Sequence, residues 1–144
     1  MYRQDYIIRL IEQFGRALAA LRNSILGRQL SPADAHAQVA VIATQSGLQL
    51  DVARTLDPVM LLMWLAPRGD ADIDPGKFWL MAELLFLEGL QARQEGRDDA
   101  ARADLERAHL ILSKLEHDWR PQADLASAAE RIAEIEDLLG VPPS

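Results

Sequence analysis

The acidic stretch Asp70-Ala71-Asp72-Ile73-Asp74 is the part of the sequence with a spacing suited to metal binding. Acids at the first, third and fifth positions match the start of a helix-loop-helix calcium loop. Such a loop also needs glycine at its sixth position and glutamate at its twelfth, where this chain has Pro75 and Met81. Because those two residues supply the turn and the bidentate ligand, we expect no metal site here. The stretch is interpreted as a solvated acidic loop, with Asp74 capping the helix that follows.

The three histidines, His36, His109 and His117, also lack a metal-binding pattern. His109 and His117 are about two helical turns apart, and no HExxH pair is present. We expect all three to be structural or solvated.

Residues for covalent or acid–base catalysis are sparse. The chain has no cysteine, which excludes thiolate chemistry, and its serines fall at predicted helix ends or on polar helix faces. Glu83 and Glu88 are the acids with the most apolar neighbours in sequence, but neither GxSxG nor a phosphate-cradling glycine loop occurs. The sequence therefore predicts a protein without enzymatic activity and without a cofactor.

The aromatic residues are dispersed over separate segments, which favours core packing over an aromatic ligand cage. They include Trp64, Trp79, Trp119, Phe78 and Phe86.

The clearest predicted element is a helical hairpin over residues 77–116, which carries Phe78, Trp79, Glu83, Phe86 and Glu88. The first arm begins at Asp74-Pro75, an N-cap followed by proline, and ends at Gly96. Apolar residues recur along both arms at helical spacing. Additional leucines in the first arm widen its apolar stripe, so this helix is expected to be buried on more than one face.

The hairpin resembles a tetratricopeptide repeat, a helical pair of about 34 residues with small and large residues at fixed places. The matching positions are Gly89, Gly96, Ala101, Leu105 and Ala108. The chain departs from the repeat in having Leu85 for the usual Trp, Ala92 for Tyr and Glu88 for Leu, and no proline ends the second helix.

The length of 144 residues fits a single domain over residues 1–144. Together with the helices predicted along the rest of the chain, the resemblance implies an all-α fold of about six helices, a TPR-like array of antiparallel helical hairpins. It also implies that the first helix of the pair lines a groove for a peptide. The matching groove positions are Glu83, Phe86, Leu90 and Arg93. The alternative is that the preceding helix covers this stripe, which would make Phe86 and Leu90 ordinary core residues.

The first predicted helix, residues 2–26, carries an apolar stripe that must be buried against the body of the protein or across a homodimer. The interface residues proposed from this stripe are Ile7, Ile11, Phe14 and Leu18. The opening DYIIRLIEQ resembles that of a family of bacterial helical proteins that also carry a degenerate repeat hairpin and have no established activity.

The remaining helices are marked by caps and breakers. One runs from Ser31-Pro32 to Gly47, and a short helical turn lies within residues 48–56. Residues 59–65 are apolar all round and are therefore expected to be buried. A last helix is predicted over residues 122–139.

Composition and charge limit the classes of partner. The net charge of −7 argues against a nucleic-acid-binding protein. Residues 1–30 hold five arginines against Asp5 and Glu12, a balance of +3, which leaves −10 for the rest of the chain. No apolar run is long enough to cross a membrane, and no signal peptide is recognised, so a cytoplasmic protein is expected.

The leading functional hypothesis is a protein-interaction or scaffold module that binds a protein or peptide partner. The module itself could work as a homodimer. The alternative is a binder of anionic lipid or of a small ligand through the basic amphipathic first helix. Of these two hypotheses, the one that involves membrane contact is less favoured than the protein-interaction module.

Overall fold

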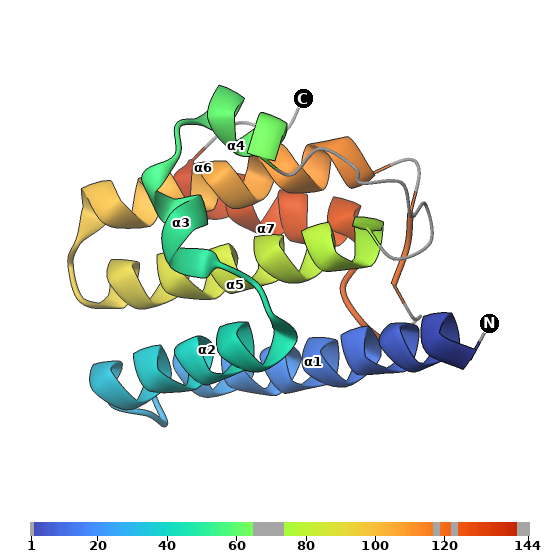
Figure 1. Ribbon diagram of the computed structural model, residues 1–144. Coiled ribbons are helices and arrows are strands. Elements are labelled where there is room, and N and C mark those ends of the chain that lie inside the picture. The colour runs from blue at the N-terminus through green and yellow to red at the C-terminus, as the bar shows by residue number, and fades with distance from the viewer. Residues whose placement is uncertain (1, 65–73, 117–118, 122–123, 141–144) are drawn as a thin grey trace.

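The computed structural model describes residues 2–64, 74–116, 119–121 and 124–140. The described residues form helices and connecting turns, without strands (Figure 1). Seven helices are present in these ranges, against about six predicted. They are α1 (Tyr2–Leu26), α2 (Pro32–Ser46), α3 (Leu50–Thr55), α4 (Pro58–Trp64), α5 (Asp74–Gln94), α6 (Asp98–Leu115) and α7 (Ala128–Leu139).

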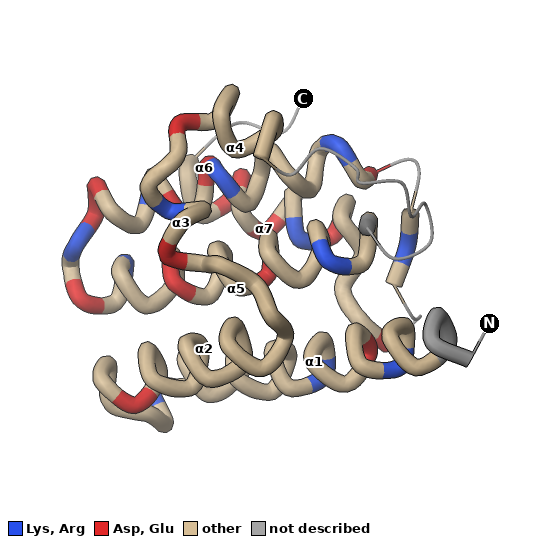
Figure 2. The backbone as a smooth tube through the Cα atoms, in the orientation of Figure 1, with Lys and Arg blue, Asp and Glu red and all other residues tan. Residues whose placement is uncertain are grey.

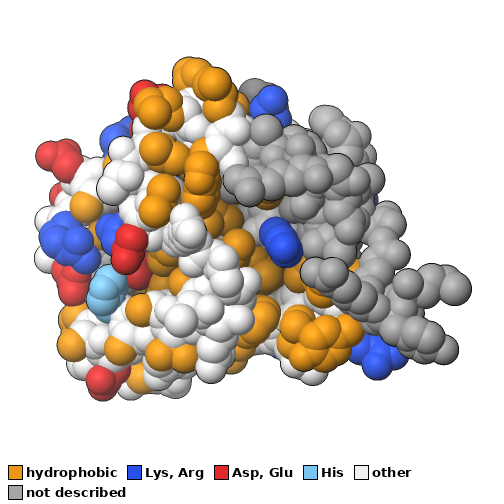
Figure 3. Space-filling model, viewed as in Figure 1, with side chains coloured by type: hydrophobic (Ala, Val, Ile, Leu, Met, Phe, Trp, Pro, Cys, Tyr) orange, Lys and Arg blue, Asp and Glu red, His pale blue; other side chains and the backbone are white. Residues whose placement is uncertain are grey.

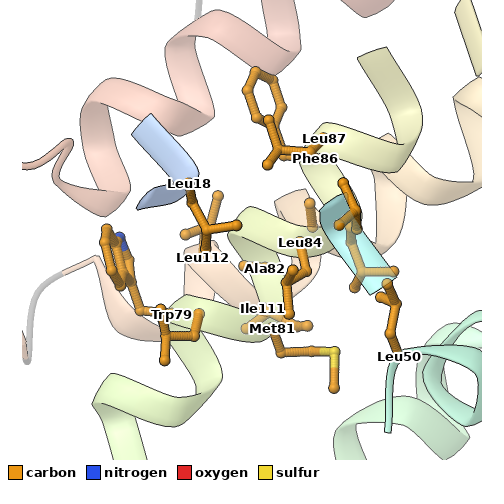
Figure 4. Packing of buried hydrophobic residues seen from close by; sticks show 14 of the residues in the cluster. Leu18, Leu50, Trp79, Met81, Ala82, Leu84, Phe86, Leu87, Ile111 and Leu112 are labelled. Atoms are coloured by element: carbon orange, nitrogen blue, oxygen red, sulfur yellow. The ribbon is translucent and has the colours of Figure 1, made fainter. Parts of the chain in front are cut away.

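Helix α5 lies at the centre of the fold. Every residue from 79 to 92 is buried, and α1, α2, α3 and α6 all pack against it. In Figure 4 the side chain of Phe86 points toward α7, whereas Met81 points in a different direction. A helix that is apolar around its whole circumference needs neighbours on every side. The helix is therefore enclosed, as its widened apolar stripe predicts.

The two helices predicted over residues 77–116 are present as α5 and α6, which run antiparallel (Figure 1), whereas the TPR-like array remains a prediction. The turn between them contains Gly96 at φ 76°, the left-handed conformation that favours glycine. Within the hairpin, a Cβ atom at Gly89 would lie 2.8 Å from the Leu105 side chain. The two helices are thus close at the point where the sequence has its smallest residue.

Helix α2 confirms the predicted caps. The Ser31 hydroxyl accepts a hydrogen bond from the Asp34 backbone N–H at 3.1 Å, Pro32 occupies the first turn, and Gly47 ends the helix at φ 74°. The short turn predicted within residues 48–56 is helix α3.

The last helix begins later than predicted. It starts at Ala128 rather than at residue 122, because Ser127 is its N-cap and accepts from the Glu130 N–H at 3.2 Å. Just before it, the Ala126 carbonyl accepts a 3.1 Å hydrogen bond from the indole N–H of Trp79. This contact gives the chain a tertiary anchor ahead of α7.

The prediction that residues 59–65 are buried is wrong for much of helix α4. Leu61 is fully buried, but Val59, Met60 and Met63 are 69%, 54% and 72% exposed. Among the described elements, this seven-residue helix packs mainly on α6 at the periphery of the fold, so much of its surface is left uncovered (Figure 1).

Helix α1 packs against the body of the protomer. Ile11 and Leu18 are buried, while Ile7 and Phe14 are half-buried against the same core. These four residues therefore have packing partners within one chain, and the homodimer remains a prediction.

Two arginines of α1 pair with acids near the C-terminal end of the chain. Arg16 lies 3.1 Å from Asp124, and Arg22 lies 2.6 Å from Glu134. The positive charge of the first helix is thus partly neutralised by the acidic body.

Candidate functional site

The first cluster of buried charge joins α5 to α7. Arg131, on α7, donates to both carboxylate oxygens of Glu83, at 2.7 Å and 3.0 Å, and its guanidinium lies 4.5 Å from the ring centre of Phe86. Arg131 also donates to Glu134, which in turn accepts from Arg22 of α1. Burial raises the pKa of the Glu83 carboxyl, and the charge of Arg131 opposes that rise. This cluster ties three helices together.

A second cluster surrounds Glu88 and Asp104, both buried. Arg54 of α3 donates to both oxygens of Asp104 at 3.1 Å and lies 3.6 Å from Glu88. His36 of α2 places its Nδ1 atom 3.1 Å from one Glu88 oxygen and 3.2 Å from the other. Arg107 of α6 lies 3.4 Å from Asp104. Burial raises the pKa of Glu88, whereas His36 and Arg54 lower it.

The Glu88–His36 pair has the geometry of a carboxylate that orients an imidazole. Of the two residues, only His36 is exposed, with 59% of its side chain accessible. Among the described residues there is no group of three acids, histidines or cysteines that could hold a metal ion. Among the residues that the structure describes, no serine or threonine hydrogen-bonds to His36. The pair therefore has no described hydroxyl nucleophile of the kind that a hydrolytic dyad would activate. The arrangement serves best as a bridge between α2 and α5.

Both clusters are fully paired. Every buried side-chain nitrogen and oxygen in the described ranges has a hydrogen-bond partner. Raised carboxyl pKa values are found at catalytic sites, but also in structural ion-pair networks. Since each carboxylate here bridges helices, the structural interpretation accounts for both.

The peptide groove predicted along α5 is not open. Glu83, Phe86 and Leu90 are 4%, 0% and 3% exposed, so three of the four predicted groove residues belong to the core. The covering element at Glu83 and Phe86 is α7, which follows α5 in the sequence, rather than the preceding helix. The comparison with the repeat family did not predict the burial of Glu83, because Arg131, its counter-ion, comes from α7.

The fourth predicted residue, Arg93, is exposed and lines a pocket at the end of the hairpin. The pocket has a volume of about 430 Å³. Its other lining residues come from the first turns of α6 and the last turn of α7, namely Asp98, Ala101, Arg102, Leu105, Leu138 and Leu139. The sequence alone did not indicate it, because α7 meets this end of the hairpin only in the folded chain.

A second surface missed by the sequence is the outer side of α4. The helix carries no charged residue, so it is tan along its length in Figure 2. In Figure 3 hydrophobic side chains gather at the top of the molecule over α4. No local pattern in the sequence marks this surface, because an apolar segment does not show which of its sides the folded chain leaves uncovered.

The other residues considered for chemistry have structural places. His109 lies 3.1 Å from Glu136 and links α6 to α7. Trp79 and Trp119 pack against each other with ring centres 5.9 Å apart, which confirms core packing for this pair. Residues 70–73 of the acidic stretch, and His117, lie outside the described residues.

No protein-family model, curated protein or solved structure matches the chain. Among the described helices, none combines the length and the apolar character needed to cross a membrane.

Proposed function

We propose that this chain is a protein-interaction module that inserts helix α4 into an apolar groove of a partner protein. The observation that carries the proposal is the exposure of Val59, Met60 and Met63 on one short helix, at 69%, 54% and 72%. Large apolar side chains gathered on one protruding element mark interaction sites more often than scattered ones do. Methionine suits such a role, because its flexible thioether adapts to irregular partner surfaces.

The shape of α4 supports a helix-in-groove arrangement in which this chain supplies the helix. The Asp57 carboxylate accepts a 2.9 Å hydrogen bond from the Met60 N–H, and so caps the helix. Arg107 of α6 donates to the carbonyl of Leu56 at 3.1 Å, and Leu61, on the inner side of α4, is buried. The helix is thus held from its inner side, and its outer side is presented in a fixed orientation.

The strength of the contact follows from the exposed fractions. Together the three side chains expose about two full side chains, so covering them contributes roughly 3–6 kcal/mol. Association itself costs about 4–15 kcal/mol. Polar contacts around the edge must therefore contribute too. Asp57 is exposed next to the apolar surface, where it caps α4, and it favours a partner groove with lysine or arginine at its rim.

The test is site-specific photo-crosslinking in the native cell. A photoreactive residue replaces Met63, and in a matched control it replaces Ala129, which is exposed on α7. We expect one defined protein to be crosslinked from position 63 and not from position 129. A Met63→Glu change in a chain that carries the photoreactive residue at Met60 should abolish the product without lowering the melting temperature. Equal crosslinking from positions 63 and 129, or none from 63, would refute the proposal.

The alternative, an anionic-lipid surface on α1, has less support. Arg16 and Arg22 already pair with Asp124 and Glu134, so their positive charge is partly neutralised within the chain. Salt-sensitive flotation with anionic vesicles would favour this alternative instead.

A further inference from the structure

We propose that the pocket at the end of the α5–α6 hairpin binds a carboxylate carried on a short apolar body. None of its residues belongs to α3 or α4, so this inference is independent of the role proposed for α4. The pocket of about 430 Å³ is within the range of small-molecule sites in proteins.

Part of the pocket lining is apolar. Leu138 and Leu139 are half-buried at the end of α7 and keep some exposed apolar surface, whereas Ala101 and Leu105 of α6 are already buried. An aliphatic chain of a few carbon atoms could cover the side chains of Leu138 and Leu139. The apolar part of a ligand would gain free energy by leaving water there.

Two guanidinium groups stand at the pocket. Arg93 donates from Nη1 to the Leu138 carbonyl at 2.7 Å, which places the arginine at the C-terminal end of α7. The Nε and Nη2 groups of Arg93 make no hydrogen bond to another described residue. Arg102 has one long contact, 3.5 Å to Glu106. Both arginines therefore retain donors for a ligand.

The charge of the lining selects a monoanion. Among the lining residues two arginines face one acid, Asp98, which gives the lining a positive balance in a chain of net charge −7. Glu106, the exposed ion-pair partner of Arg102, lies outside the lining. Asp98 lies at the start of α6 and would repel a second negative charge on the ligand. A carboxylate matches the planar donor fork of arginine, and its single charge matches the balance of the lining. A phosphate dianion fits less well.

Two sources can supply this chemistry: a free aliphatic acid, or the C-terminal carboxylate of a peptide that ends in an apolar residue. The probe for the first is hexanoate, with hexanol as the uncharged match. The probe for the second is a short peptide ending in leucine, with its C-terminal amide as the match.

Binding is measured by amide chemical-shift titration of the full chain. We expect hexanoate to produce saturable shifts at Ala101, Leu105 and Leu138, and hexanol to bind at least tenfold more weakly. The Arg102→Gln variant should lower the hexanoate affinity at least tenfold, because Arg102 contributes charge without joining helices. Arg97→Gln is the matched control: Arg97 lies on the α5–α6 turn outside the pocket, and its loss should leave the affinity unchanged.

The peptide pair then assigns the source. Tighter binding of the acid peptide than of hexanoate supports the site with a peptide C-terminus as its ligand, and the reverse order supports it with a free acid. Shifts spread over the whole surface, equal binding of hexanoate and hexanol, or equal losses from Arg97→Gln and Arg102→Gln would each overturn the proposal.

Discussion

The buried ion pair of Glu83 and Arg131 leads to a quantitative prediction about the stability of the protein. Its side chains are only 5% and 8% exposed, so water can solvate neither charge if the other is removed. We expect Arg131→Met to leave the Glu83 carboxylate as a buried charge without its main counter-ion. Removing one partner of such a pair costs roughly 3–5 kcal/mol. For a domain of this size the melting temperature should fall by about 10–20 °C.

The loss should depend on pH, with a defined sign. Burial raises the pKa of Glu83 above that of the unfolded chain, and in the variant Arg131 no longer opposes the rise. The folded variant therefore takes up a proton before the unfolded chain does as the pH falls. Stability lost at neutral pH should be recovered as the pH falls through the raised folded-state pKa toward the unfolded value of about 4.3.

The assay is urea unfolding of the wild type and Arg131→Met at neutral pH and again near pH 5. The matched control is the double variant Glu83→Gln/Arg131→Met, in which no carboxylate is left to be buried. The double variant should be more stable than Arg131→Met at neutral pH and should lose the pH dependence that sets the single variant apart. If Arg131→Met costs less than about 1 kcal/mol, or costs the same at both pH values, the pair does not hold a buried charge.

Two further predictions concern helix packing. Gly89→Ala should destabilise the protein by about 1–2 kcal/mol in thermal unfolding, because the overpacking caused by a methyl group 2.8 Å from Leu105 exceeds the gain in helix propensity; a stabilised variant would show that Leu105 can move away. Phe14→Asp should lower the melting temperature of a monomer, because Phe14 packs against the core of its own chain. A change in mass by light scattering without a change in stability would instead place Phe14 in a dimer interface.

The sequence predicted those parts of the fold that depend on local signals. Caps and breakers such as Ser31, Gly47 and Gly96 act within a few residues of themselves, so they marked the ends of α2 and α5. The apolar residues all around α5 were likewise sufficient to predict that it is enclosed.

The positions that depend on distant partners were not predictable in this way. Glu83 reads as a polar rim residue until Arg131, 48 positions later, is brought beside it. Helix α4 reads as core because its composition is apolar, and only the arrangement of α6 and its neighbours shows that one side stays uncovered. The pocket beside Arg93 requires the end of α7, whose position no local pattern specifies.

The enclosure of α5 has a consequence for amide hydrogen exchange. The amides between residues 79 and 92 are covered by several helices, so no single neighbour can detach and expose them all. Their exchange should require unfolding of the whole chain, and the slowest of them should report the global free energy of unfolding. Helix α4, held mainly through α6, can open alone and should exchange much faster. A bound partner would slow exchange in α4 and leave the difference between α5 and the rest of the core nearly unchanged.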